Sequence, residues 1–315
     1  MKILLENQAV RFREFIHRHN NAIEGIAIVP DKYKIAVFSY DVGLYFSNFQ
    51  IDIAYSFSRT GAISLKADDR AIFSMVWKPD GTEILTGGAA GEATRWDAQN
   101  GEVITKYQFG ENPILSVAWS PDGRQVAGGG WDNCIYIADT LSHETKLVAD
   151  LGTPPAMGEG DALAWIGWSP DGKHLATAGW DKKVRIWEVT NDAINIKFEL
   201  EGHTESLYCG AWIDDGAKLA SGGESIHIWD TSSGKLSQKL GNTKGSINTI
   251  AWKPENSFIA AGDSKGAITI WNTETGQQIR QIQTMLDDIR TVAWFSNYLL
   301  YGGKSSDRWM IPIFD

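Results

Sequence analysis

The chain has 315 residues, of which 43% are hydrophobic and 22% charged, and its formal net charge is −10. This composition indicates a globular protein, and the acidic balance argues against nucleic acid or an anionic membrane as partner, because phosphate binding requires a dense basic field. No stretch of about 18 apolar residues predicts a membrane-spanning helix, and the apolar N-terminal run is too short for a secretory signal. Cys134 and Cys209 lie in separate apolar stretches, so we expect two core thiols in a soluble, cytoplasmic protein.

A short phrase recurs along the chain, and each copy contains an apolar strand that ends just before a turn. The clearest copies read VAWSPDG at residues 117–123 and IGWSPDG at residues 166–172. In chain order, the anchor positions of the seven copies are Ile28, Trp77, Trp119, Trp168, Trp212, Trp252 and Trp294. Their spacings are 49, 42, 49, 44, 40 and 42 residues, close to the roughly 40–45 residues of a four-stranded propeller blade.

The same succession of predicted elements follows each anchor. A Pro-Asp-Gly turn reverses the chain, since Pro fixes φ and Gly tolerates a positive φ. A second apolar strand and a Gly-rich turn lead to a third strand, which ends in Trp96, Trp187, Trp229 or Trp271 in four of the copies. A polar turn then precedes a fourth, alternating strand. Short strands with such regular turns predict an all-β propeller, and no segment longer than a few residues predicts a helix.

The Trp-Asp pairs at residues 96–97 and 229–230, with the Gly-His pair at residues 202–203, resemble the WD-repeat family. The resemblance covers nearly the whole chain and implies a seven-bladed propeller with four-stranded antiparallel blades, forming one domain over residues 1–315. The last repeat ends at its third strand, so we expect residues 8–16, approximately, to supply the fourth strand of blade seven. In the family this pairing closes the ring and removes an exposed sheet edge.

In the family, a His, a Ser or Thr, an Asp and a Trp of each blade form a hydrogen-bonded chain. Blade four of this sequence has the Thr, Asp and Trp without a preceding Gly-His pair. Blade five has His203, Ser221 and Trp229, but its turn between the second and third strands is two residues short and lacks the Asp. We expect these residues to be structural, with His203 bracing the blade rather than acting as a general base.

Matches to catalytic and ligand-binding motifs fail on their structural context. Residues 262–266 match the G-x-S-x-G pattern, but a strand rather than a helix follows them, so a hairpin turn is the expected structure. Residues 303–305 resemble the end of a phosphate loop without its first Gly or its helix. Only His17 and His19 have metal-like spacing, and we expect both to be solvated. The sequence therefore predicts no enzyme activity, no catalytic residues, no metal and no cofactor.

The family resemblance implies a top face built from two sets of loops, and the repeat register indicates which side chains point out of it. The expected partner-binding residues form an apolar arc on blades two to five, joined by one residue of the long loop 152–161: Phe73, Leu115, Trp131, Trp180, Tyr208 and Met157. The rest of the face carries a secondary polar rim: Glu24, Tyr40, Asn248, Arg290 and Lys304. Clustered exposed aromatic rings are typical of interfaces. The alternative is that Trp131 and Trp180 pack over their own blades and that the loop is a tolerated insertion.

The leading functional hypothesis is a non-enzymatic scaffold, adaptor or recognition subunit of a larger complex, which binds protein partners through the apolar arc. The propeller itself is expected to be monomeric or part of a hetero-complex. The alternative is a reader of a peptide or modified residue at the channel mouth, where an aromatic cage and a carboxylate such as Glu24 would hold a cation. An enzyme on a propeller scaffold is the least favoured class, because no polar constellation supports it.

Overall fold

The part of the chain that the structure describes consists of strands and their connections. The computed structural model describes residues 23–29, 34–39, 43–52, 56–65, 71–152, 161–190, 193–241, 244–254, 257–295 and 298–304. All regular elements within these ranges are β-strands, so the described residues include no helix that could cross a membrane. The predicted closing strand at residues 8–16 lies outside the described residues, and closure of the ring by that strand stays a prediction.

Six of the described sheets have four antiparallel strands, and each sheet uses consecutive strands of the chain. The first sheet contains β1 (Ile23–Val29), β2 (Lys34–Ser39), β3 (Gly43–Asp52) and β4 (Ser56–Leu65), and the second contains β5 (Ile72–Trp77), β6 (Glu83–Gly88), β7 (Glu92–Asp97) and β8 (Val103–Gln108). The third sheet contains β9 (Ile114–Trp119), β10 (Gln125–Gly130), β11 (Cys134–Asp139) and β12 (Thr145–Asp150), and the fourth contains β13 (Leu163–Trp168), β14 (His174–Gly179), β15 (Val184–Val189) and β16 (Ile194–Leu200). The fifth sheet contains β17 (Cys209–Trp212), β18 (Lys218–Gly222), β19 (Ile226–Asp230) and β20 (Lys235–Leu240), and the sixth contains β21 (Ile247–Trp252), β22 (Phe258–Asp263), β23 (Ala267–Asn272) and β24 (Gln278–Gln283). The seventh described sheet pairs β25 (Asp288–Phe295) with β26 (Tyr298–Lys304).

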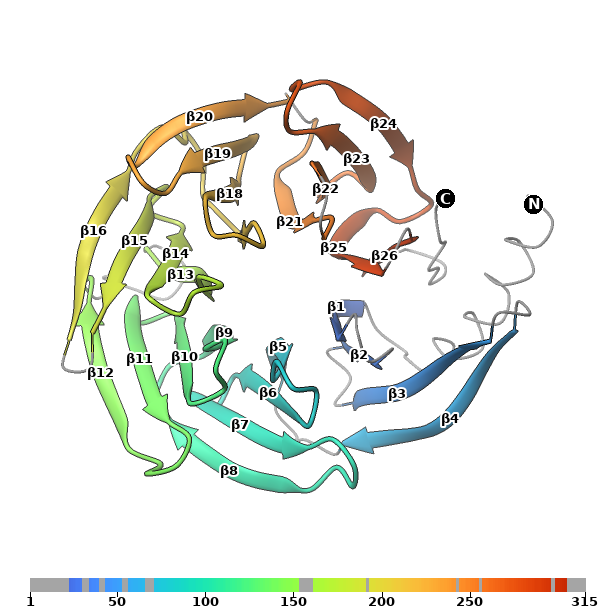
Figure 1. Ribbon diagram of the computed structural model, residues 1–315, viewed down its shortest axis with the longest axis vertical. Coiled ribbons are helices and arrows are strands. Elements are labelled where there is room, and N and C mark those ends of the chain that lie inside the picture. The colour runs from blue at the N-terminus through green and yellow to red at the C-terminus, as the bar shows by residue number, and fades with distance from the viewer. Residues whose placement is uncertain are drawn as a thin grey trace.

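The sheets follow one another around a common axis in chain order, with the first strand of each sheet nearest the axis and the fourth at the periphery (Figure 1). The first and last sheets are neighbours, because the backbone N–H of Ile26 in β1 donates to Oγ1 of Thr291 in β25 at 3.1 Å. This arrangement confirms the predicted all-β propeller.

The repeated Pro-Asp-Gly turns form as their sequence predicts. Gly123 has a φ of 70°, a conformation that costs a residue with a Cβ more than it costs glycine. Its N–H donates to the carbonyl of Ser120 at 2.9 Å. The Asp122 carboxylate accepts from the Ser120 hydroxyl at 2.6 Å and from the Arg124 N–H at 3.0 Å. The Asp of this turn is therefore a turn former.

Hydroxyl groups on the innermost strands join neighbouring sheets. Besides the Ile26–Thr291 contact, Oγ of Ser74 accepts from the N–H of Val117, and Oγ1 of Thr249 accepts from the N–H of Val292, each at 3.1 Å. Ser116 makes the equivalent contact with the N–H of Ile166 at 3.1 Å. These contacts give backbone donors at the sheet boundaries a partner, which buried N–H groups need.

The boundary between the fourth and fifth sheets departs from this rule. Trp165 occupies the position of the hydroxyl residue in β13, and its ring lies against Gly210 of β17. A Cβ placed on Gly210 would lie 2.5 Å from Cε3 of Trp165, closer than two such atoms can approach. The fourth and fifth sheets are thus joined by an aromatic ring packed on a bare backbone rather than by a hydroxyl.

The anchor Trp side chains supply a second set of links between sheets. Nε1 of Trp212 donates to the carbonyl of Gly167 at 3.0 Å, and Nε1 of Trp252 donates to that of Ala211 at 2.9 Å. Trp77 and Trp294 make the equivalent bonds to Ala27 and Ala251, each at 3.1 Å. The recurring Trp of the sequence therefore fastens each of these sheets to the one before it, in addition to filling the core.

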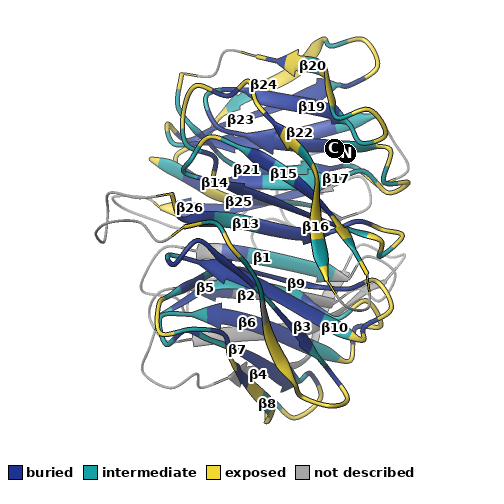
Figure 2. Ribbon diagram, turned by 90° about the vertical axis from the view of Figure 1, so that its left-hand side faces the viewer, coloured by how far each residue is buried: buried dark blue, intermediate teal, exposed yellow. Residues whose placement is uncertain are grey.

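The core lies between successive sheets rather than at one centre. Between the second and third sheets, it is built from large apolar side chains that include Leu85, Tyr107, Phe109, Ile114 and Trp119. Figure 2 shows buried residues concentrated in the inner strands, with exposed residues on outer strands and turns. Cys134 and Cys209 are both buried and free, which confirms the prediction of two core thiols.

Candidate functional site

The top face is defined by the antiparallel connectivity of the sheets. Since each sheet begins at the axis and alternates in direction, the turns between second and third strands emerge on the same side as the loops that lead to the next sheet. Backbone bonds tie the two sets together: the N–H of Trp131 donates to the carbonyl of Pro113 at 3.1 Å, and that of Trp180 donates to Ala162 at 2.9 Å. Trp131 and Trp180 of the predicted apolar arc therefore lie on a backbone that is tied to the neighbouring loop.

The members of the apolar arc differ in exposure. The Tyr208 side chain is exposed, with 41% of its surface accessible, whereas Phe73, Leu115, Trp131 and Trp180 are half-buried. The indole nitrogen of Trp180 is covered and has no hydrogen-bond partner. Trp180 therefore combines a packed edge with a partly accessible ring. Met157 lies outside the described residues, as does most of the 152–161 loop.

The segments that carry two members of the arc adjoin at one corner, where the loop before β17 lies against the β14–β15 turn. The N–H of Leu207 donates to the carbonyl of Gly179 at 3.0 Å, and Oγ of Ser206 donates to the carbonyl of Trp180 at 3.3 Å. Nζ of Lys182 adds a bond to the carbonyl of Thr204 at 2.8 Å. The fourth and fifth sheets thus bring Trp180 and the exposed Tyr208 to adjoining segments of the top face.

Exposed apolar surface on this face extends beyond the predicted arc. Met285 is 79% exposed in the loop between β24 and β25, which belongs to the same set of loops as the one carrying Tyr208. The repeat register did not single it out because loop residues outside the strand positions have no fixed orientation in the repeat. The division of the face into an apolar and a polar arc is therefore less complete than the sequence suggests.

The polar rim contains a compact hydrogen-bonded group between the sixth and seventh sheets. Nδ2 of Asn248 donates to Oδ1 of Asp288 at 2.6 Å and to the carbonyl of Ile289 at 3.1 Å, and Nε of Arg290 donates to Oδ2 of Asp288. Asp288, which the sequence analysis did not single out, joins the two predicted residues. Lys304 is exposed at the end of β26. Tyr40 and the side chain of Glu24 lie outside the described residues.

The fifth sheet contains a buried polar chain that is more complete than its sequence indicates. Nε1 of Trp229 donates to Oγ of Ser221 at 2.8 Å, and this oxygen lies 2.8 Å from Nε2 of His203. Nδ1 of His203 lies 3.1 Å from Oε2 of Glu224. Glu224, in the shortened β18–β19 turn, therefore supplies the carboxylate that was expected to be missing. The longer Glu side chain makes up for the two absent residues.

A second histidine lies against this chain. The ring of His227 in β19 stacks on that of His203, with centroids 3.7 Å apart and planes inclined by 19°. Burial, followed by the adjacent His203, lowers the pKa of His227 to about 4. Burial likewise lowers the pKa of His203, against the opposing effect of Glu224. Both rings are consequently neutral at neutral pH. With Glu224 they form the only group among the described residues whose ligand atoms are close enough to hold a metal ion.

The fourth sheet confirms the predicted bond between its Trp and Thr, whereas its Asp bonds to other groups. Nε1 of Trp187 donates to Oγ1 of Thr177 at 3.0 Å. Asp181 accepts from the N–H of Lys183 at 3.1 Å and forms an ion pair with Arg185 at 2.6 Å. This sheet achieves the bracing role without a histidine.

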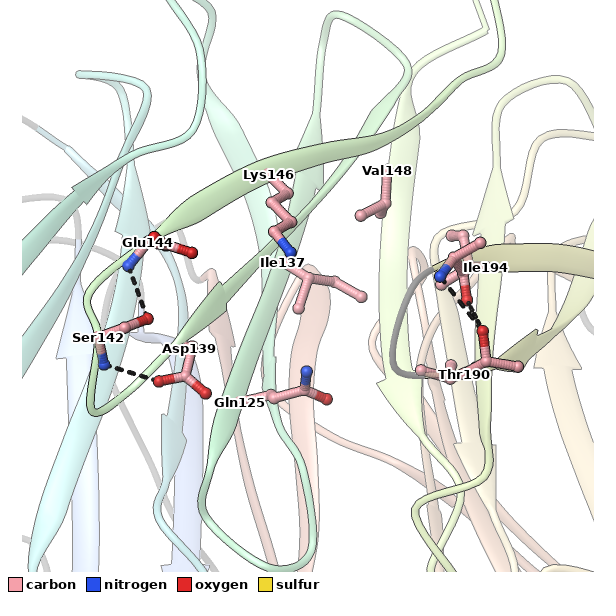
Figure 3. A pocket seen from close by; sticks show the side chains of 11 residues that line it. Gln125, Ile137, Asp139, Ser142, Glu144, Lys146, Val148, Thr190 and Ile194 are labelled. Atoms are coloured by element: carbon pink, nitrogen blue, oxygen red, sulfur yellow. Dashed lines mark hydrogen bonds between the residues drawn. The ribbon is translucent and has the colours of Figure 1, made fainter.

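The motif matches rejected from the sequence have the expected structures where they are described. Residues 262–266 span the turn between β22 and β23, and Asp263 accepts from the N–H groups of Lys265 and Ala267, both at 2.9 Å. A cleft of about 300 Å³ lies between the third and fourth sheets (Figure 3). At its edge the Asp139 carboxylate accepts from the N–H groups of Leu141 and Ser142, both at 2.8 Å, which makes it a turn former rather than a poised acid or base.

Two family descriptions match the chain. The family "Anaphase-promoting complex subunit 4 WD40 domain" matches residues 26–121 and 220–297, which is more than half of the chain. The family "WD domain, G-beta repeat" matches residues 160–188 and 195–230. Together these matches include sequence from both of the predicted Trp-Asp pairs.

Several characterised proteins are similar to parts of the chain. It is 26% identical over 260 residues to the WD repeat-containing protein 26 homolog of Arabidopsis thaliana, covering 69% of this chain and 44% of that protein. It is 35% identical over 74 residues to THO complex subunit 3 of the same organism, covering 22% of this chain and 23% of that protein. It is 36% identical over 56 residues to the U5 small nuclear ribonucleoprotein 40 kDa protein of Homo sapiens, covering 17% and 16%, respectively. The chain therefore spans less than half the length of each of these relatives.

Proposed function

The chain belongs to the WD-repeat family, and on that premise we propose that it is a non-enzymatic scaffold that binds protein partners through its top face. The observation that carries the proposal is the corner at Tyr208. This aromatic side chain is 41% exposed, while its own N–H is bonded to the carbonyl of Gly222 at 3.2 Å and the adjacent Leu207 N–H is bonded to Gly179. A large ring presented from a fixed backbone gives contact area at little cost in conformational entropy.

The names of the relatives support a role within an assembly. THO complex subunit 3 is named as a subunit of a complex, and the U5 40 kDa protein is named as part of a ribonucleoprotein. The second name also describes a nuclear particle, so the cytoplasmic location expected from the sequence stays a prediction. Protein rather than nucleic acid is the proposed partner of this chain because its net charge is −10.

The reader hypothesis is less well supported by the described polar rim. An aromatic cage for a cation needs a carboxylate with unsatisfied negative charge. The two oxygens of Asp288 are already bonded to Asn248 and Arg290. This compensation favours a scaffold over a reader of modified residues.

The test is recovery of partners by the tagged full-length chain from lysate of its own organism, with quantitative mass spectrometry. We expect Tyr208→Ala and Trp180→Ala to reduce recovery of one or more stoichiometric partners, with affinity losses of about 30-fold for a central anchor residue. Leu141→Ala is the matched control, because Leu141 is 80% exposed but lies in the β11–β12 turn on the opposite face. Equal recovery by all three variants, each still folded, would refute the proposed surface.

A further inference from the structure

The described structure contains one polar cluster whose composition exceeds what bracing of the fold requires. His203 comes from the loop before β17, Glu224 from the β18–β19 turn and His227 from β19. In the fourth sheet a Thr and a Trp make the corresponding bond with no histidine. The fifth sheet adds two histidines and a glutamate at the top face, and the second histidine has no role in the bracing chain.

We propose that His203, Glu224 and His227 bind a zinc-class transition-metal ion. This inference goes beyond the proposed scaffold role and does not depend on it. The three ligand atoms lie within 4.8 Å of one another. Two nitrogens and one carboxylate oxygen, with the fourth position left to water, form a donor set that zinc accepts. Calcium and magnesium prefer oxygen ligands alone, so this set discriminates against them.

The two distances from the Glu224 carboxylate to the histidine nitrogens are close to those around such an ion. Nδ1 of His203 lies 3.1 Å from Oε2 of Glu224, and Nε2 of His227 lies 3.7 Å from Oε1 of Glu224. Tetrahedral coordination with bonds of about 2.0–2.1 Å places neighbouring ligand atoms about 3.4 Å apart. The two distances fall on either side of that value. The stacked rings must tilt apart to direct both lone pairs at one ion, a rotation about the side-chain bonds of His227.

His227 supplies the independent evidence for a ligand. Its side chain is buried, with 1% of its surface accessible, and neither ring nitrogen has a hydrogen-bond partner. A buried polar group without a partner costs free energy, and a bound ion is one of the established explanations for such a group.

The surrounding groups fit both the metal-free and the metal-bound state. Without metal, Nδ1–H of His203 donates to Glu224 while the Ser221 hydroxyl donates to Nε2. With metal, the neutral His203 ring changes tautomer: Nε2–H donates to Ser221 and the Nδ1 lone pair binds the ion, with no net release of a proton. Ser221 is held in place by the Trp229 indole at 2.8 Å, so it orients the ligand ring in both states.

The ion can reach the site from solvent past Glu224. The Glu224 side chain is 22% exposed, and Nζ of Lys239 lies 3.6 Å from its Oε1. Lys239 is 47% exposed and can swing away. It competes with the metal for the carboxylate, so removing its charge should tighten binding.

The test uses the full chain, freed of metal with a chelator and titrated with Zn²⁺ by calorimetry and with Co²⁺ by visible absorption. We expect one equivalent of Zn²⁺ to bind, and Co²⁺ to give the intense d–d bands of a four-coordinate site. His227→Ala and Glu224→Gln should each weaken binding by about 100-fold or more, at or above the loss that follows removal of an outer-shell partner. Lys239→Met should strengthen it.

His174→Ala is the control for adventitious binding, because His174 is a half-buried histidine near Asp171 in the fourth sheet. It should leave the affinity unchanged. The proposal is overturned if the wild-type chain takes up no stoichiometric Zn²⁺, or if His174→Ala abolishes binding while Glu224→Gln does not. Should His227→Ala fail to fold, the Glu224→Gln and Lys239→Met titrations and the Co²⁺ spectrum of the wild-type chain still decide the question.

Discussion

The contact between the first and last sheets can be tested by removing a single hydroxyl. Oγ1 of Thr291 accepts the N–H of Ile26 at 3.1 Å, and Thr291 is buried, with 7% of its surface accessible. Thr291→Val keeps the shape of the side chain but leaves that N–H without a partner. A buried donor left unsatisfied costs about 1–3 kcal/mol. At about 2 °C per kcal/mol for a chain of this size, we expect Tm to fall by about 2–6 °C.

The measurement is differential scanning calorimetry of the full chain, with Thr249→Val as the matched control. Thr249 makes the same contact with Val292 at 3.1 Å, one boundary earlier in the ring. If the first and last sheets are joined as firmly as the others, the two variants should lose similar stability. A Tm for Thr291→Val within about 1 °C of wild type, beside a clear loss for Thr249→Val, would show that the ring is not held at this boundary.

Three further predictions concern packing, pH and closure. Gly210→Ala should destabilise the fold by about 1–3 kcal/mol, because the added methyl group overpacks against Trp165. Thermal unfolding should show that this loss of stability is smaller in a Trp165→Phe background. An unchanged Tm for Gly210→Ala would contradict the close contact. The hydroxyls and N–H groups of Ser232 and Ser233 lower the pKa of Asp230 to about 2, below the unfolded value of about 3.9. The ionised Asp230 carboxylate should therefore stabilise the fold above about pH 4, and this stabilisation should be lost as the pH falls from about 4 to 2. NMR titration should find the pKa raised in Ser232→Ala/Ser233→Ala, and an unaltered value would refute the cause given. Deletion of residues 1–16 should yield aggregated protein if they complete the seventh sheet, whereas a soluble product with wild-type Tm would rule that closure out.

The architecture could be predicted from the sequence because its signals are local. The Trp anchors at 77, 119, 168, 212 and 252 each stand at the last residue of an inner strand. A strand that ends at a fixed residue and is followed by a turn with fixed chemistry repeats its geometry at each copy. The predicted core cysteines and the hairpin turn at residues 262–266 follow from the same local rules.

The candidate site was less predictable because it depends on distances between separate loops. Glu224 reaches His203 only through the shape of a turn that is shorter than its counterparts, and no spacing rule in the repeat encodes that reach. His203 and His227 lie far apart in sequence, so metal-ligand spacing could not reveal them, although their rings stack at 3.7 Å. The exposure of Met285 depends likewise on a loop outside the repeat register.

Several departures from the repeat lie at the fourth and fifth sheets. Trp165 replaces the linking hydroxyl there, and Gly210 provides the bare backbone on which its ring packs. The loop before β17 is hydrogen-bonded to the β14–β15 turn of the preceding sheet, and it carries both His203 and the exposed Tyr208. Glu224 takes the place of the Asp that the family has in its hydrogen-bonded chain. Where residues depart from the repeat pattern and neighbouring residues take over their contacts, a functional site is the expected reason. The same corner of the top face is therefore the place where partner binding and metal binding should be tested first, and the Tyr208 and His227 variants separate the two because neither residue serves the other role.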